Sequence, residues 1–178
     1  TTRQWPIGAL ILREDSMGLY LGDKKSGYTH FVLKEDSLDT TDKQPNHFYQ
    51  YQSITYMRIV AMGFPIEIST KQEGMVNEDL TLHSFNFSFE GSGQKLGIKG
   101  EVQDSNQLRL STYSEGDWNR STVEFTPPIY HTEIVHLVLA KEGLKVGKER
   151  EYQIFDPLTN LGSITLTVLA REELTLPN

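Results

Sequence analysis

Residues 22–29, with the sequence GDKKSGYT, come nearest in this chain to a loop that binds the phosphates of a nucleotide. Such a loop has Gly, four residues, Gly, Lys and then Ser or Thr, and it joins a buried strand to a helix whose amino end faces the anion. The two glycines and the final threonine keep that spacing, but Tyr28 stands in the place of the lysine, and the residues that follow alternate as in a strand. The segment therefore predicts a β-hairpin with Asp23-Lys24-Lys25-Ser26 at its tip and Gly22 and Gly27 at its ends.

Two histidines, His131 and His136, lie in the segment HTEIVH and could suggest a zinc-protease helix. That pattern places two histidines four residues apart on one helical face, with a glutamate directly after the first. Here the separation is five residues, which turns the second ring by about 140° around a helix, and Glu133 is displaced by one position. We therefore predict no metal site and no cofactor. The remaining histidines are dispersed along the chain: His30, His47 and His83.

Other catalytic groups are missing or lack a pattern. The chain contains no cysteine, so it has no thiol nucleophile and no thiolate metal ligand. It also contains no Gly-x-Ser-x-Gly sequence. Adjacent carboxylates such as Glu78-Asp79 are common, but neighbours in a strand point to opposite faces and do not form an acid–base pair. We expect no enzymatic activity from this chain, with a carboxylate enzyme acting on glycans as an alternative.

The length and charge of the chain narrow its organisation and its partners. A length of 178 residues suits a single domain over residues 1–178, and because the sequence begins at Thr1 without Met we expect a fragment of a longer chain. The net charge is −7, and the 17 Lys and Arg residues are scattered, which we interpret as solvated surface. Nucleic acid is not expected as a partner, because phosphate contacts need clustered cations. No apolar run approaches the roughly 18–20 residues that span a bilayer, so we do not expect a membrane-spanning chain.

Alternation of apolar and polar residues recurs along most of the chain and predicts β-strands. In residues 64–74, Phe64, Ile66 and Ile68 face one way and the polar residues between them face the other. In residues 80–91, LTLHSFNFSFEG, the two leucines are out of phase with the phenylalanines, which predicts a bulge or a register change near His83–Ser84. Turn residues separate these runs, so we expect about ten strands in an antiparallel meander.

One segment departs from this alternation. In residues 130–142, apolar residues recur at helical spacing. Thr132 or the prolines before the segment suit a helix start, and Gly143 suits a helix end. The β-branched pair Ile134-Val135 leaves a buried strand as an alternative. We predict one main helix over about residues 130–142, packed on the sheet, and hence a mainly β (α+β) fold.

Aromatic residues are the remaining candidates for a ligand or partner surface. They gather in two strand segments and comprise Tyr49, Tyr51, Tyr56, Phe85, Phe87 and Phe89. If the sheet curves, its concave face could hold an apolar ligand against these rings. The alternative is that the rings are ordinary core beneath the helix.

The order of these segments resembles a known family. It runs from LYLGDKKSGYTHFVL (residues 19–33) through YQYQSITYMRI (49–59) and FPIEISTKQE (64–73) to PPIYHTEIVHLVLAKEGLKVGKEREYQIFDP (127–157) and SITLTVLAREEL (163–174). This arrangement is similar to the β-rich domain that precedes the catalytic domain in bacterial exported transglutaminase-like proteins of the papain superfamily. The matched positions are Gly22, Lys25, Gly27 and Tyr28 in the hairpin, Gly143-Leu144 and Gly147 in a turn, and Tyr152 with Phe155-Asp156-Pro157 in a late strand.

The resemblance implies a non-catalytic function. Enzymes of that family act through a Cys-His-Asp triad in the following domain, and this chain has no cysteine to supply the nucleophile. The expected function is that of a non-catalytic accessory domain of an envelope protein, which positions the adjoining catalytic domain or binds a protein or peptide partner. The resemblance also implies a periplasmic or otherwise extracytoplasmic location and a curved, half-barrel-like sheet. The alternative function is a periplasmic carrier that binds a lipid or other apolar ligand on the aromatic face.

Overall fold

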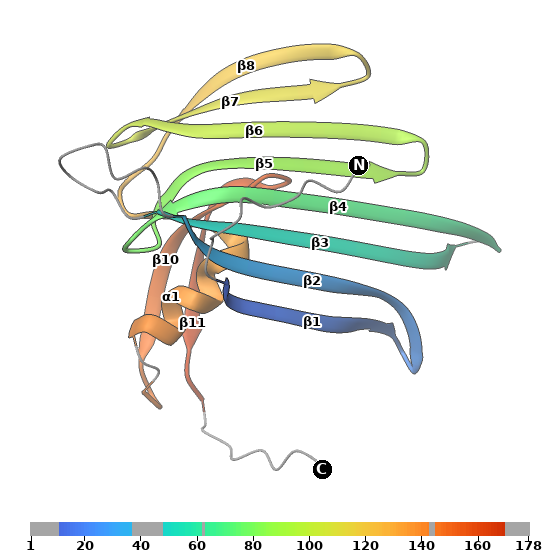
Figure 1. Cartoon of the computed structure of the whole chain (residues 1–178), viewed down its shortest axis with the longest axis horizontal. Coiled ribbons are helices and arrows are strands. Elements are labelled where there is room, and N and C mark those ends of the chain that lie inside the picture. The colour runs from blue at the N-terminus through green and yellow to red at the C-terminus, as the bar shows by residue number, and fades with distance from the viewer. Residues whose placement is uncertain (1–10, 37–47, 62, 143–144, 170–178) are drawn as a thin grey trace. The chain divides into compact units, whose positions relative to one another are not determined.

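The structure is a computed structural model that describes residues 11–36, 48–61, 63–142 and 145–169 (Figure 1). The chain divides into two compact units, Thr1–Phe125 and Thr126–Asn178, and each is described by itself. The prediction of one domain over residues 1–178 stays a prediction.

The first unit is an eight-stranded sheet whose strands follow one another in space as they do in sequence. All neighbouring strands are antiparallel, which confirms the predicted meander. The sheet is curved (Figure 1). It is also open and does not close into a barrel, because β1 and β8 lie at its two edges. The strands are β1 (Ile11–Leu21), β2 (Lys24–Asp36), β3 (Phe48–Ala61), β4 (Phe64–Asn77), β5 (Leu82–Gly91), β6 (Gln94–Asp104), β7 (Gln107–Ser114) and β8 (Asp117–Glu124).

The second unit holds a three-stranded sheet and the α-helix. Its elements are β9 (Ile129–His131), a 3₁₀ turn (Thr132–Ile134), α1 (Val135–Glu142), β10 (Glu149–Asp156) and β11 (Asn160–Thr167). The central strand β10 pairs antiparallel with β11 and parallel with β9.

The helix was predicted in the right place but with the wrong start. Tyr130 and His131 belong to β9, where they lie opposite Ile154 and Phe155 of β10. The pairing with β10 satisfies backbone groups that a longer helix would have satisfied internally, and α1 therefore begins only at Val135. Gly143, which we expected to end the helix, lies outside the described residues.

The opening hairpin is confirmed, with a tighter turn than the sequence predicts. Leu21 pairs with Lys24, so the loop consists of Gly22 and Asp23 alone, and residues 24–26 already belong to β2. Gly22 has a φ of 61°, a conformation that favours glycine. The segment therefore forms no phosphate-binding loop, because a strand and not a helix follows it.

The register gives the sheet one buried apolar face and one polar face. On the buried face, Tyr51 lies opposite Gly74, and Phe85 lies opposite both Gly74 and Gly100. A Cβ added at Gly100 would lie 2.0 Å from Cε1 of Phe85, and one at Gly74 would lie 2.5 Å from Cε1 of Tyr51. The two glycines thus leave the space that the two rings occupy.

The predicted bulge is also confirmed. Met75 pairs with Ser84 and Val76 with Leu82, so His83 is the extra residue in β5. This insertion is why Leu82 and Phe85, three residues apart, both lie on the buried face.

Candidate functional site

The six aromatic residues singled out in the sequence divide between the two faces of the sheet. Tyr49, Tyr51, Phe85, Phe87 and Phe89 share one face, because the register places them on matching positions of β3, β4 and β5. Of these, the three at the centre are buried: Tyr51, Phe85 and Phe87.

Tyr56 lies on the opposite face. It pairs with Tyr28 of β2, and the two ring centroids are 6.0 Å apart. The structure therefore does not gather all six rings into one surface. A role of the five-ring face in binding a lipid or partner stays a hypothesis, and the burial of its central rings is that of ordinary core.

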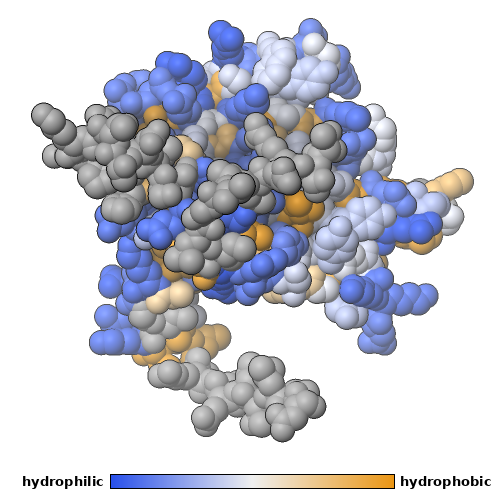
Figure 2. Space-filling model, viewed as in Figure 1, coloured by the Kyte–Doolittle hydropathy of each residue, from blue (hydrophilic) through white to orange (hydrophobic). Residues whose placement is uncertain are grey.

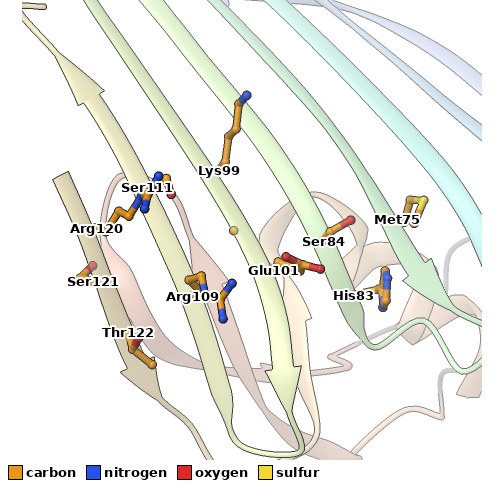
Figure 3. A pocket seen from close by; sticks show the side chains of 11 residues that line it. Met75, His83, Ser84, Lys99, Glu101, Arg109, Ser111, Arg120, Ser121 and Thr122 are labelled. Atoms are coloured by element: carbon orange, nitrogen blue, oxygen red, sulfur yellow. The ribbon is translucent and has the colours of Figure 1, made fainter. Parts of the chain in front are cut away.

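A groove opens on the polar face of the sheet, across the strands from β4 to β8 (Figure 3). Its volume is about 770 Å³. We call it the basic groove, and its lining consists of Met75, His83, Ser84, Lys99, Gly100, Glu101, Arg109, Ser111, Arg120, Ser121 and Thr122. These residues come from segments far apart in sequence, and the meander places them side by side.

Two neighbouring rows of cross-strand partners position the cations of the basic groove. Lys99 of β6 lies opposite Ser111 of β7, which in turn lies opposite Arg120 of β8. In the next row, Arg109 lies between Glu101 and Thr122. Because side chains directly opposite one another are about 5 Å apart at Cβ, the short Ser111 leaves space between two long cationic side chains. Figure 3 shows Arg120 close to Ser111.

The charge of the basic groove contrasts with that of the whole chain. The lining contains three Lys or Arg residues and one carboxylate, Glu101. The chain as a whole has 17 Lys and Arg against 24 Asp and Glu. Cations held close together on one surface create a positive potential, and guanidinium groups bind carboxylates through two parallel hydrogen bonds. The basic groove is therefore suited to hold an anionic group.

An aromatic pair borders this cationic surface. Trp118 of β8 is 58% exposed, although tryptophan is usually buried. Its ring packs against Tyr113 with a centroid distance of 5.3 Å, and Nζ of Lys99 lies 5.7 Å from the centroid of the Trp118 ring. The exposed indole thus offers an apolar surface next to the cations, as binding sites for protein segments commonly do.

His83 contributes a ring that is engaged with a neighbouring side chain. Its imidazole lies against Phe48, with centroids 4.8 Å apart. In the described part of the chain, no group of three or more His, Cys, Asp or Glu residues is arranged to hold a metal ion.

The second unit buries a histidine that the sequence could not distinguish from a surface one. His131 has no exposed side-chain area, and burial lowers its pKa from 6.5 to about 4, with the charge of Asp156 opposing that shift. Its Nδ1 accepts a hydrogen bond from the backbone N–H of Glu133, at 3.4 Å, and so caps the 3₁₀ turn. Asp156 accepts hydrogen bonds from Leu158 and Thr159 and ends β10.

A tyrosine links α1 to β10 in the same unit. The hydroxyl of Tyr152 donates a 2.7 Å hydrogen bond to Oε2 of Glu142, and the ring packs edge-on against Tyr130 at 5.8 Å. Burial, followed by the hydrogen bond to Glu142, raises the pKa of Tyr152 to about 12.

We expect Tyr152→Phe to lower the free energy of unfolding by about 1 kcal/mol, because it removes this hydrogen bond and keeps the ring. Urea unfolding followed by circular dichroism measures the difference. Glu142→Gln keeps an acceptor for the tyrosine hydroxyl, so we expect it to lower the free energy of unfolding less than Tyr152→Phe does. Equal stability of Tyr152→Phe and the unaltered chain would contradict a stabilising role for the contact.

No helix among the described residues is long and apolar enough to cross a membrane. No family model, no curated protein and no solved structure matches the chain. The resemblance to transglutaminase-like domains therefore rests on the residues quoted for it in the sequence.

Proposed function

We propose that this chain is a non-catalytic binding module whose basic groove takes an acidic segment of a protein or peptide partner. The observation that carries the proposal is that Lys99, Arg109 and Arg120 line one groove of an acidic protein. The single carboxylate among the lining residues, Glu101, leaves the groove with an excess of positive charge.

The spacing of the two arginines indicates the form of the acidic segment. Arg109 lies opposite Thr122, and Arg120 is two residues from Thr122 along β8. Such diagonal neighbours are about 7 Å apart at their Cα atoms. Two residues along an extended peptide span a similar distance, about 7 Å. Carboxylates at positions i and i+2 of an extended segment therefore match Arg109 and Arg120.

The wider setting of the module follows from the resemblance noted in the sequence. In a transglutaminase-like envelope protein, the module would position an adjoining catalytic domain or recruit a separate partner. Sequencing the parent gene tests this part of the proposal by itself. A reading frame that lacks a downstream domain with Cys, His and Asp would contradict the accessory role without affecting the groove.

The binding proposal is tested with a fluorescein-labelled peptide that carries Glu at alternate positions, followed by fluorescence anisotropy. We expect Arg109→Glu/Arg120→Glu to weaken binding at least tenfold, about 1.4 kcal/mol or more, because both cationic contacts become repulsive. Added salt should weaken the binding of the unaltered chain, since exposed charges are screened.

Two controls separate the basic groove from the charge of the whole protein. Lys145→Glu/Lys148→Glu changes the net charge equally at two exposed residues of the second unit, and it should bind as the unaltered chain does. A peptide with Gln in place of Glu should not bind. Equal losses in the two double variants would show that total charge, and not the groove, governs binding and would overturn the proposal.

A further inference from the structure

The hairpin of β3 and β4 extends beyond the strands on either side of it. Pairing between β2 and β3 ends at Gly27 and Met57, and pairing between β4 and β5 ends at Ile68 and Gly91. The pairing of β3 with β4 continues further, from Arg58 opposite Glu67 to Ala61 opposite Phe64. We call the described residues 58–61 and 63–67 the projecting tip, and Figure 1 shows the ends of β3 and β4 reaching past the neighbouring hairpins.

The projecting tip is apolar beyond its first cross-strand pair, Arg58 and Glu67, whose side chains lie 3.7 Å apart. Every residue from Ile59 to Ile66 is apolar or glycine, in the sequence IVAMGFPI. Val60 is 70% exposed and Phe64 is 72% exposed, among the most exposed large apolar side chains of the described residues. In Figure 2, apolar atoms lie at the end of the molecule where Figure 1 places this tip.

Both faces of the ribbon are apolar. Ile59 lies opposite Ile66 on one face, and Val60 lies opposite Pro65 on the other. A strand pair that packs on one surface typically has its apolar residues on that face and polar residues on the other. A ribbon that is apolar on both faces removes the most apolar surface from water when its environment surrounds it. Hydrocarbon is such an environment.

The neighbouring hairpin adds side chains typical of a membrane interface. Tyr20 and Leu21 are each 64% exposed and Tyr28 is 47% exposed, and they lie near the turn between β1 and β2. Lys24 and Lys25 follow in the same hairpin and are exposed. This turn is at the same end of the sheet as the projecting tip, because β2 and β3 run antiparallel from the Gly27–Met57 pair. Tyrosines and lysines beside an apolar centre suit the headgroup region of an anionic bilayer.

We propose that the projecting tip docks this protein on the surface of an anionic lipid bilayer. The insertion is shallow, because the outer edges of a two-stranded ribbon carry backbone groups that hydrocarbon cannot satisfy. The two terminal residue pairs reach about 7 Å, which matches the depth at which interfacial segments lie. Pro65 removes one backbone donor from the outer edge of β4. The same missing donor disfavours the addition of a strand from a protein partner along that edge.

Flotation with lipid vesicles tests the proposal on the full chain. The vesicles contain phosphatidylcholine and phosphatidylglycerol at about 2:1, with pure phosphatidylcholine for comparison. We expect the unaltered chain to float with the anionic vesicles and Val60→Ser/Phe64→Ser to lose at least tenfold in partitioning. The matched control is Val146→Ser/Leu158→Ser, which removes two side chains that are each 58% exposed in the second unit and should leave flotation unchanged.

A fluorescent label gives an independent measure of insertion. Because the chain has no cysteine, Phe64→Cys provides one site for an environment-sensitive nitrobenzoxadiazole dye, and Leu158→Cys provides the control site. The dye at position 64 should shift to the blue with anionic vesicles, and the dye at position 158 should not. No flotation of the unaltered chain, or equal flotation of the tip variant, would overturn the proposal. Self-association that is lost in Val60→Ser/Phe64→Ser, without vesicle binding, would instead assign the tip to a protein contact and would also overturn it.

Discussion

Replacing Gly100 by alanine is expected to lower the free energy of unfolding by about 3 kcal/mol, the upper part of the range for overfilled cores. The added Cβ would lie 2.0 Å from Cε1 and 2.6 Å from Cζ of Phe85, which is closer than non-bonded carbon atoms approach. Phe85 is 4% exposed and cannot turn away without displacing other buried side chains. Urea unfolding, followed by fluorescence and circular dichroism, measures the difference in stability.

The control for this prediction lies on the same strand. A Cβ at Gly97 would meet its nearest neighbour, Cβ of Tyr113, at 3.6 Å, which is an ordinary contact. We expect Gly97→Ala to change stability by less than about 0.5 kcal/mol or to raise it, because glycine is unfavourable within a strand. Combining Gly100→Ala with Phe85→Leu should lower the free energy of unfolding by less than the two single changes do when their losses are added. Similar losses for Gly100→Ala and Gly97→Ala would contradict the proposed fit of ring against glycine.

Stability is expected to fall by about 3 kcal/mol between pH 7 and pH 4 because of His131 alone. The pKa of this imidazole is lowered to about 4 in the folded protein by burial, from 6.5. Well above pH 6.5 the imidazole is neutral in both states and contributes no pH dependence. As the pH falls from 6.5 toward 4, the unfolded chain binds a proton that the folded chain does not, so folding becomes less favourable. Below about pH 4 this loss is complete.

The contribution of His131 is isolated by comparison with His131→Asn. Asparagine also caps the start of a helical turn, so it can replace the acceptor that Nδ1 offers to the N–H of Glu133. Urea unfolding at several pH values from 7 to 4.5 would compare the two chains, and the other titrating groups are common to both. We expect the unaltered chain to lose stability more steeply below pH 6.5. If the free energy of unfolding of the two chains changed equally with pH, that result would contradict the effect of burial on the pKa of this histidine.

Much of the strand framework could be predicted from the sequence. Alternating residues and turn signals predicted the meander, and the change of phase between Leu82 and Phe85 predicted the bulge at His83. These are local signals, because adjacent strands of a meander are joined by short turns. The hairpin at Gly22 was predictable for the same reason, since two strand-like segments flank its glycines.

The sites depend on register, which local patterns define poorly. The basic groove combines Lys99, Arg109 and Arg120 from three strands, and their meeting depends on where the two connecting turns lie. In the sequence they were scattered basic residues, interpreted as solvated surface. The separation of Tyr56 from Tyr51 was visible beforehand, because residues five apart in a regular strand point to opposite faces. The run of apolar residues around Gly63 was likewise visible, but its exposure follows only from the length of the hairpin beyond its neighbours.

The helix start shows how pairing across the fold overrides local spacing. Apolar residues recur at helical intervals from Tyr130, but His131 is buried in β9 and pairs with β10. The parallel pairing with β10 is a long-range interaction that no window of residues around position 130 reveals.

An NMR titration of the ¹⁵N-labelled chain with the alternating-glutamate peptide tests the binding function most directly. If the basic groove holds an acidic segment, the amide signals of Lys99, Arg109, Ser111 and Arg120 will move as peptide is added, and will stay in place with the glutamine peptide. Signals in the groove that do not move, while the peptide binds elsewhere or not at all, would contradict it.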